Sequence, residues 1–78
     1  MKTNILNMSI IANNIRRLRL LANLTQPELA KKLHVSTSSI YAWEKEKSYP
    51  SLKNILSLCN YFDVKVDNLI GVPSMINR

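Results

Sequence analysis

Glycine and cysteine are scarce in this sequence, and each shortage argues against a class of structure. A single glycine disfavours a sheet built on tight glycine turns. The one cysteine, Cys59, can form neither an internal disulfide nor a metal cluster, as expected in a reducing compartment. The sequence also shows no signal peptide and no apolar stretch long enough to span a membrane, so we expect a cytoplasmic protein.

Basic residues, in contrast, are abundant. Eleven Lys and Arg against five Asp and Glu give a formal net charge of +6, which makes polyanions the first class of partner to consider. Hydrophobic residues make up 46% of the 78 residues, enough for one small core. The sequence offers no paired carboxylates, no Ser/His/Asp set, no phosphate-cradling glycine loop and no metal-ligand cluster. We therefore expect a binding domain without cofactor or metal, and not an enzyme.

The spacing of apolar residues predicts helices along most of the chain. Between residues 9 and 22 they recur every three to four positions, and Asn23 can close this helix in a left-handed conformation. A second helix, ending near His34, follows Thr25, which can form a capping box with Glu28. The inward stripe of the first helix comprises Ile11, Ile15, Leu18 and Ala22.

A third helix follows at once and has two different faces. Ser36 can cap it, and Val35 can pack against Ile40 as a hydrophobic staple. Ile40 shares the inner face with Trp43 and Glu44. The opposite face has little apolar area and no acid, so packing in the core does not explain it. That face carries Thr37, Ser38, Tyr41, Ala42 and Lys45.

Two further helices complete an all-α prediction. Ser51 can cap a helix over residues 52–62, and a short helix over residues 66–70 ends at Gly71. The longer of the two has a broad apolar face, which is typical of a helix at the centre of a bundle. This face comprises Leu52, Ile55, Leu56, Leu58, Cys59 and Phe62. The domain then covers residues 9–71, between an N-terminal arm (1–8) and a C-terminal tail (72–78).

The second and third predicted helices are joined by only His34, Val35 and Ser36. So short a connection forces a sharp crossing, and the small side chain of Ala30 lets the two axes approach closely. This is the geometry of a helix-turn-helix, whose second helix enters the major groove of DNA. The polar face of the third helix would then meet base edges, while the positive charge attracts phosphates.

Segments spread along the chain, without insertion, carry a family resemblance: residues 15–19, 24–30, 35–36, 43–44 and 50–52, followed by apolar positions up to Leu69. Together they resemble the phage repressor and Cro-type (Xre-type) DNA-binding domains, in register from about residue 10 to residue 71. The resemblance implies a five-helix, lambda-repressor-like bundle of bacterial or phage origin that binds double-stranded operator DNA as a dimer.

The resemblance also implies roles for individual side chains. Base contacts fall on Thr37, Ser38, Tyr41 and Ala42. Contacts to the sugar-phosphate backbone fall on Gln26, Lys45, Lys47 and Ser48. A partly buried ion pair between Arg19 and Glu44 would tie the first helix to the end of the third.

The chain departs from the family pattern at a few turns. Where the family often has glycine, it has Asn23, His34, Glu46 and Asp63. Asn, His and Asp tolerate a left-handed backbone well, whereas Glu46 fits it less easily, so we expect the turn after the third helix to differ in detail. Lys65 stands where a capping Ser or Thr is usual, and the fifth helix is expected to fray.

The C-terminal end is the predicted dimer contact. One recognition helix reads few base pairs, so a lone module needs a second copy to find its site in a genome. An apolar run at this end exceeds what the fourth helix requires, and it comprises Leu69, Ile70, Val72, Met75 and Ile76. The alternative is that this run folds back over the domain's own core.

Two functions remain open from the sequence. The first is a sequence-specific transcriptional regulator, most often a repressor in this family, that binds a palindromic operator as a homodimer. The second is a protein-interaction module, such as an antitoxin that masks a toxin and also binds its own operator. Because no ligand-sensing domain is expected, control would come from abundance, protein partners or competition at the operator.

Overall fold

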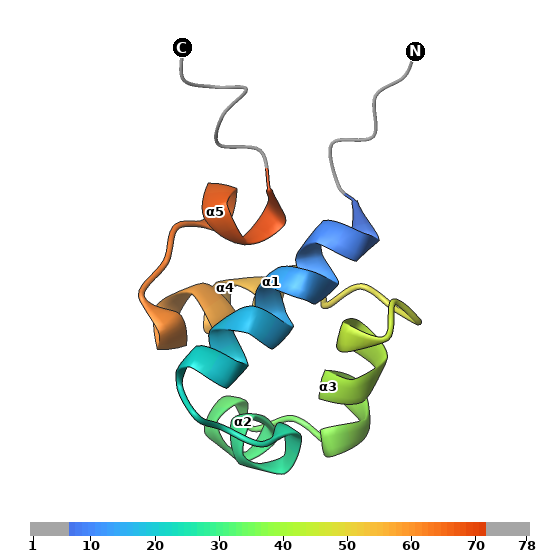
Figure 1. The fold of residues 1–78 in the computed structure, drawn as a ribbon, viewed down its shortest axis with the longest axis vertical. Coiled ribbons are helices and arrows are strands. Elements are labelled where there is room, and N and C mark those ends of the chain that lie inside the picture. Colours follow the sequence, from blue (N-terminus) through green and yellow to red (C-terminus); the bar gives the residue numbers. More distant parts are fainter. Residues whose placement is uncertain (1–6, 72–78) are drawn as a thin grey trace, which may run out of the picture.

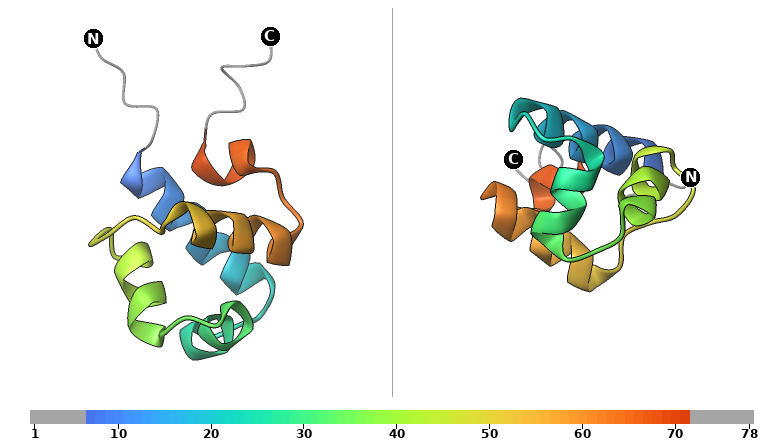
Figure 2. Two further views of the ribbon diagram at one scale, coloured as in Figure 1. Left: turned by 180° about the vertical axis from the view of Figure 1, so that it is seen from behind. Right: turned by 90° about the horizontal axis from the view of Figure 1, so that it is seen from below.

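The computed structural model describes residues 7–71, and within this range it contains five helices and no strand. In chain order they are α1 (Met8–Leu21), α2 (Gln26–Leu33), α3 (Thr37–Glu44), α4 (Leu52–Phe62) and α5 (Val66–Ile70). α1 crosses the middle of the molecule with α4 behind it, α2 lies at one end and α5 at the other, and α3 runs along one side (Figures 1 and 2). The all-α prediction is confirmed.

Side-chain caps explain where most of these helices begin. In α1 to α4 the residue before the first turn accepts a hydrogen bond from a backbone N–H of that turn; these residues are Asn7, Thr25, Ser36 and Ser51. Both bonds of the predicted capping box are present, because the Glu28 carboxylate also accepts from the Thr25 N–H at 2.8 Å. Lys65 makes no side-chain cap for α5. The first turn of α5 is closed instead by backbone hydrogen bonds, because the Lys65 carbonyl accepts from the N–H groups of Asn68 and Leu69.

Four residues other than glycine adopt the left-handed backbone. The φ angle is +59° at Asn23, +58° at His34, +62° at Glu46 and +56° at Asp63. These are the four positions where the resembled family often has glycine, so this chain keeps the left-handed turns with other residues. The turn after α3 is left-handed in spite of Glu46, and the deviation expected there is not seen.

Each helix contributes one fully buried aliphatic side chain to a single core. These side chains are Ile15, Leu29, Ile40, Leu58 and Leu69, all at most 1% exposed. Trp43 and Cys59 are buried beside them, as predicted, and burial raises the pKa of the Cys59 thiol. In addition, the Asn14 amide donates to the carbonyl of Leu69 at 2.8 Å and so ties α1 to the end of α5.

Both ends of α1 differ from the prediction. The helix begins at Met8 and not at Ser9, because the side chain of Asn7 accepts a hydrogen bond from the Ser9 N–H at 2.8 Å. Ala22 was predicted to face inward, but it is the exposed C-cap residue, since the helix ends at Leu21. The C-cap lies one residue before the predicted Asn23, and this removes Ala22 from the inward stripe.

The broad apolar face predicted for α4 is narrower in the structure. Ile55, Leu58 and Cys59 are buried, but Leu52 is 73% and Leu56 51% exposed. The two leucines lie on one flank of the buried stripe, where the other helices within residues 7–71 cover them only partly. Their assignment to the core is therefore wrong. Among the described residues, no helix is long and apolar enough to cross a membrane.

Candidate nucleic-acid interface

The turn between α2 and α3 is closed by backbone hydrogen bonds. His34 is left-handed, and the N–H of Val35 returns to the carbonyl of Ala30 at 3.0 Å. Ala30 is only 3% exposed, and because its side chain is a single methyl group, α2 and α3 can pack closely there. The pair therefore has the sharp crossing that the three-residue connection predicted, with α3 presented along the side of the molecule (Figure 2).

One face of α3 anchors the helix, and the other is open to solvent. Ile40 and Trp43 are 0% and 4% exposed and fix the helix in the core. On the outer face the predicted base-contacting side chains lie together, with Ala42 partly covered and the others exposed: Thr37, Ser38, Tyr41 and Ala42. This face presents hydroxyl groups, a phenol and a methyl, which are groups that can contact base edges.

A buried ion pair holds the end of α3 against α1. The Arg19 guanidinium donates to both carboxylate oxygens of Glu44, at 2.7 and 2.9 Å, and the two side chains are 10% and 3% exposed. A third bond from Arg19 reaches the carbonyl of Leu24 at 2.8 Å. The bond to Glu44 and its negative charge raise the pKa of Arg19 against the opposing effect of burial. The predicted pair is thus a satisfied, charge-assisted contact.

Gln26 joins the same network. Its side-chain Nε2 donates to Glu44 Oε1 at 3.1 Å, so the first residue of α2 is tied to the last residue of α3. Reasoning from the sequence proposed a phosphate contact for Gln26 and missed this bond. Nothing in the local sequence could reveal it, because the two residues are separated by 18 positions.

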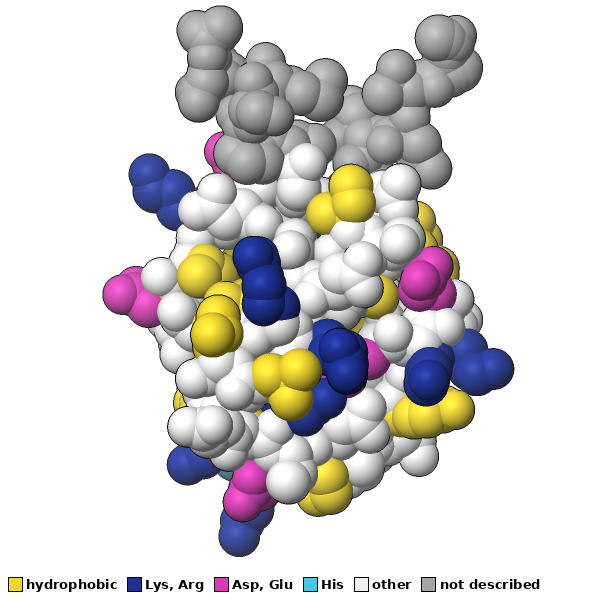
Figure 3. Space-filling view, in the orientation of Figure 1, with side chains coloured by type: hydrophobic (Ala, Val, Ile, Leu, Met, Phe, Trp, Pro, Cys, Tyr) yellow, Lys and Arg dark blue, Asp and Glu magenta, His cyan; other side chains and the backbone are white. Residues whose placement is uncertain are grey.

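Cations and a phenol surround the end of α3. Lys45, Lys47 and Ser48 are exposed, and Lys45 Nζ lies 5.9 Å from the centre of the Tyr41 ring, within cation–π range. The N–H of Lys47 donates to the carbonyl of Ala42 at 2.8 Å and so closes the turn. Along the edge of the molecule that α3 occupies, Lys or Arg side chains lie beside hydrophobic ones (right in Figure 3).

The predicted dimer contact is not available as proposed. Leu69 is 1% exposed and belongs to the domain's own core, since α5 packs on α1 and α4. Ile70 is partly buried. Val72, Met75 and Ile76 lie outside the described residues. The assignment of Leu69 to a dimer interface is therefore wrong, because its side chain has no surface left to offer.

Other kinds of site find little support in the described part of the chain. Residues 7–71 contain no group of three or more His, Cys, Asp or Glu side chains placed to hold a metal ion. Every buried side-chain nitrogen and oxygen in this range has a hydrogen-bond partner. The outer face of α3, with its flanking cations, is an exposed surface that packing in the core does not explain.

The comparisons with known proteins point to one family. The model of the helix-turn-helix family matches residues 15–69. An HTH-type transcriptional regulator of Methanocaldococcus jannaschii is 46% identical over 57 residues, which are 73% of this chain and 86% of that protein. The HTH-type transcriptional activator BcrR of Enterococcus faecalis is 36% identical over 62 residues, 80% of this chain. This chain spans only 30% of the length of BcrR.

Two further similarities are to an antitoxin and to a repressor bound to DNA. The antitoxin PezA of Streptococcus pneumoniae is 32% identical over 68 residues, 87% of this chain and 43% of PezA. Among solved structures, the P22 c2 repressor in complex with a synthetic operator superposes with a TM-score of 0.75 at 27% identity. The superposition covers 81% of this chain and 96% of the repressor chain.

Proposed function

This chain belongs to the helix-turn-helix family of DNA-binding transcriptional regulators, and from that premise we propose that it represses transcription as a homodimer on a palindromic operator. α3 enters the major groove, and its residues Thr37, Ser38, Tyr41 and Ala42 contact bases. The start of α2 and the segment after α3 bind phosphates through Gln26, Lys45, Lys47 and Ser48. The P22 c2 repressor, which has the same fold, was solved bound to an operator.

The observation that carries the proposal is the contrast between the two faces of α3. Ile40 and Trp43 lock the helix in the core, while the opposite face is polar and carries no acidic residue. The major groove, about 12 Å wide, admits one α-helix and offers a distinct pattern of donors and acceptors for each base pair. A rigid helix with an uncommitted polar face suits this task.

Selection from a random duplex library tests the proposal. We expect a two-fold symmetric consensus, with half-sites about 34 Å apart centre to centre, one turn of the double helix. A promoter that carries the selected site should be less active when the protein is present. Uniform recovery of all sequences would contradict specific recognition, and higher promoter activity would identify an activator in place of a repressor.

The similarity to the antitoxin PezA supports a second candidate function. In this alternative the chain also binds a protein partner, and operator binding accompanies that role. Purification from the native host distinguishes the two: a stoichiometric partner protein at all salt concentrations favours the antitoxin-type role. A chain that elutes alone and binds the operator at full strength favours the regulator.

A further inference from the structure

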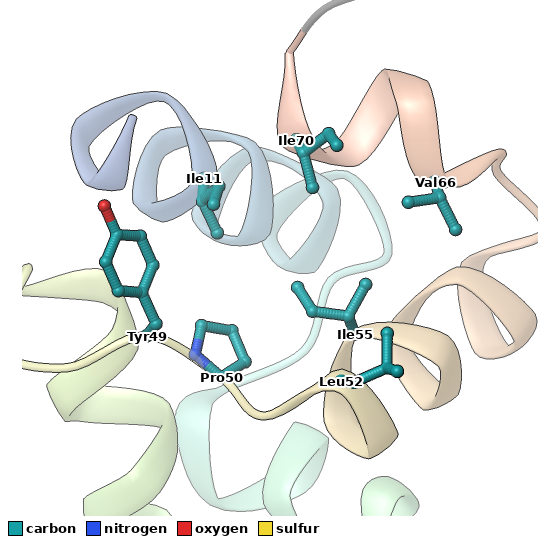
Figure 4. Close-up of a pocket in the computed structure, with 7 residues that line it drawn as sticks. All are labelled: Ile11, Tyr49, Pro50, Leu52, Ile55, Val66 and Ile70. Atoms are coloured by element: carbon teal, nitrogen blue, oxygen red, sulfur yellow. The ribbon is translucent and has the colours of Figure 1, made fainter. Parts of the chain in front are cut away.

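An apolar pocket of about 270 Å³ opens between α1, α5 and the start of α4. Ile11 from α1, Ile55 from α4 and Ile70 from α5 line its walls, and Tyr49 and Pro50 from the loop before α4 close one side. Figure 4 shows these side chains arranged around a common space. For comparison, an apolar cavity of roughly 150 Å³ holds a benzene molecule. The pocket therefore has room for a large aliphatic side chain.

The rim of this pocket leaves apolar surface in contact with water. Leu52 forms part of the lining and is nevertheless 73% exposed, and the ring of Tyr49 is 46% exposed. Leu56, one turn further along α4, is 51% exposed. Single exposed leucines are common, but a contiguous apolar patch with a hollow in it marks a contact surface. The pocket therefore favours an apolar occupant.

We propose that this occupant is the C-terminal segment of the same chain, residues 72–78, which lies outside the described residues. The segment follows Ile70 and Gly71 directly, so it begins at the wall of the pocket. An extended chain spans at most about 3.3–3.6 Å per residue, so residues 72–76 reach about 17 Å, enough to cross a pocket of this volume. The apolar side chains available to fill the pocket are Val72, Pro73, Met75 and Ile76.

Gly71 fixes the point from which the segment starts. Its φ angle is +88°, and a side chain at this position would collide with Cγ2 of Ile10. The backbone of Gly71 therefore lies against α1, beside the residue that precedes Ile11 of the pocket wall. Asn14, one turn further along α1, donates to the carbonyl of Leu69 at 2.8 Å and holds the end of α5 in place. The start of the segment is thus anchored to two of the helices that form the pocket.

Residues 1–6, which also lie outside the described range, start further from the pocket. They join α1 through Asn7, whose side chain caps that helix. The first pocket residue after them is Ile11, about one turn beyond Met8. Residues 72–78, in contrast, continue from the pocket wall itself.

A segment held in this pocket joins α1, α4 and α5. The gain is largest for α5, because it has only five residues and no side-chain cap. The segment also covers apolar surface at Leu52, so another molecule reaches this surface only by displacing it. Its side chains then serve the chain's own domain in place of a dimer contact. The inference goes beyond the proposed function and does not depend on DNA binding.

Nuclear Overhauser effects between methyl groups test the proposal in the full chain. We expect contacts from the methyl groups of Met75 or Ile76 to those of Ile55 and Val66, which line the pocket. A sample that mixes labelled and unlabelled chains should show none of these contacts between chains, because the segment binds the pocket of its own chain.

Substitutions on both sides of the contact provide a second measurement. Met75→Asp should lower Tm by about 4 °C or more, and Ser74→Asp, which adds the same charge at the preceding position, by less than half as much. In a Leu52→Glu background the loss from Met75→Asp should fall by at least half, because the two side chains share one contact. Leu21→Glu is the matched background: Leu21 is 74% exposed and does not line the pocket, so the full loss should persist.

Several results would overturn the proposal. One is a wild-type chain without contacts between residues 72–78 and the pocket. Others are contacts that come from Ile5 or Leu6, or from a second chain, because the pocket then has a different occupant. Equal losses for Ser74→Asp and Met75→Asp, or an undiminished loss in the Leu52→Glu background, also refute the contact. A chain that binds no duplex refutes the proposed function instead and leaves this contact intact.

Discussion

Arg19 in α1 and Glu44 in α3 are joined by two hydrogen bonds, of 2.7 and 2.9 Å, at a site where both side chains are almost fully buried. The carboxylate also accepts a hydrogen bond from Gln26 at the start of α2. One acid therefore fixes the end of α3 relative to both helices that precede it. Because buried charges are costly when unpaired, this contact links the stability of the fold to the position of α3.

The first prediction concerns this ion pair. Glu44→Gln leaves the Arg19 charge buried without its counter-charge and should lower the free energy of unfolding by about 2 kcal/mol or more. The matched control is Glu46→Gln, two residues further along, whose exposed side chain should contribute within about 0.5 kcal/mol. Urea denaturation measures both. Equal midpoints for the two variants would show that the pair contributes nothing to stability.

The second prediction separates a phosphate contact from general charge. Lys47→Ala should weaken binding to all duplexes alike and should reduce the slope of log K against log salt by about 1. Lys65→Ala removes the same charge from the turn between α4 and α5, away from α3 (Figure 1). The Lys65 variant should keep the wild-type slope in a fluorescence titration. Identical slopes for both variants would mean that Lys47 does not reach the DNA.

The third prediction concerns base reading by α3. Ser38→Ala and Thr37→Val remove hydroxyl groups from the exposed face and should change which sequence is preferred. At the best site each should cost about 1–3 kcal/mol if the hydroxyl makes a base contact. Affinity for random duplex should stay the same, and competition binding measures both quantities. An equal loss on specific and random DNA would assign these side chains to the sugar-phosphate backbone.

The fourth prediction uses the left-handed turn after α3. Glu46 adopts a φ of +62°, a conformation that costs residues other than glycine roughly 1–2 kcal/mol. Glu46→Gly should therefore raise the free energy of unfolding, by up to about 1 kcal/mol after the extra entropy of glycine is subtracted. This corresponds to a rise in Tm of about 4–8 °C. Lys47→Gly, at the next position, should instead lower Tm, and the opposite order would remove backbone strain as the explanation.

The fifth prediction is a pH dependence at the start of α2. Hydrogen bonds from the backbone and hydroxyl groups of Thr25 lower the pKa of the Glu28 carboxyl from its ordinary value. A lowered pKa in the folded state means that this group stabilises the fold above its unfolded pKa of about 4.3. The contribution is lost as the pH falls through the lower, folded value. The difference in Tm between wild type and Glu28→Gln should thus be largest near neutral pH and should vanish in acid.

Much of the candidate site follows from local rules that operate within one helical turn. Ser36 as a cap, Ile40 and Trp43 on one face of α3, and the exposed residues opposite them could all be predicted from spacing. The same spacing rules failed at Leu52 and Leu56, which have the periodicity of a buried face. Whether such residues are covered depends on helices that come from elsewhere in the chain.

The sequence by itself determined the caps of α2, α3 and α4, three of the four left-handed turns and the order of the five helices, because each depends on the conformational preferences of neighbouring residues. Only the tertiary structure decided that Gln26 donates to Glu44, that Leu69 is enclosed in the core, and that a pocket opens beside two exposed leucines. These features depend on the distances between segments far apart in the chain. No periodicity within one segment contains that information.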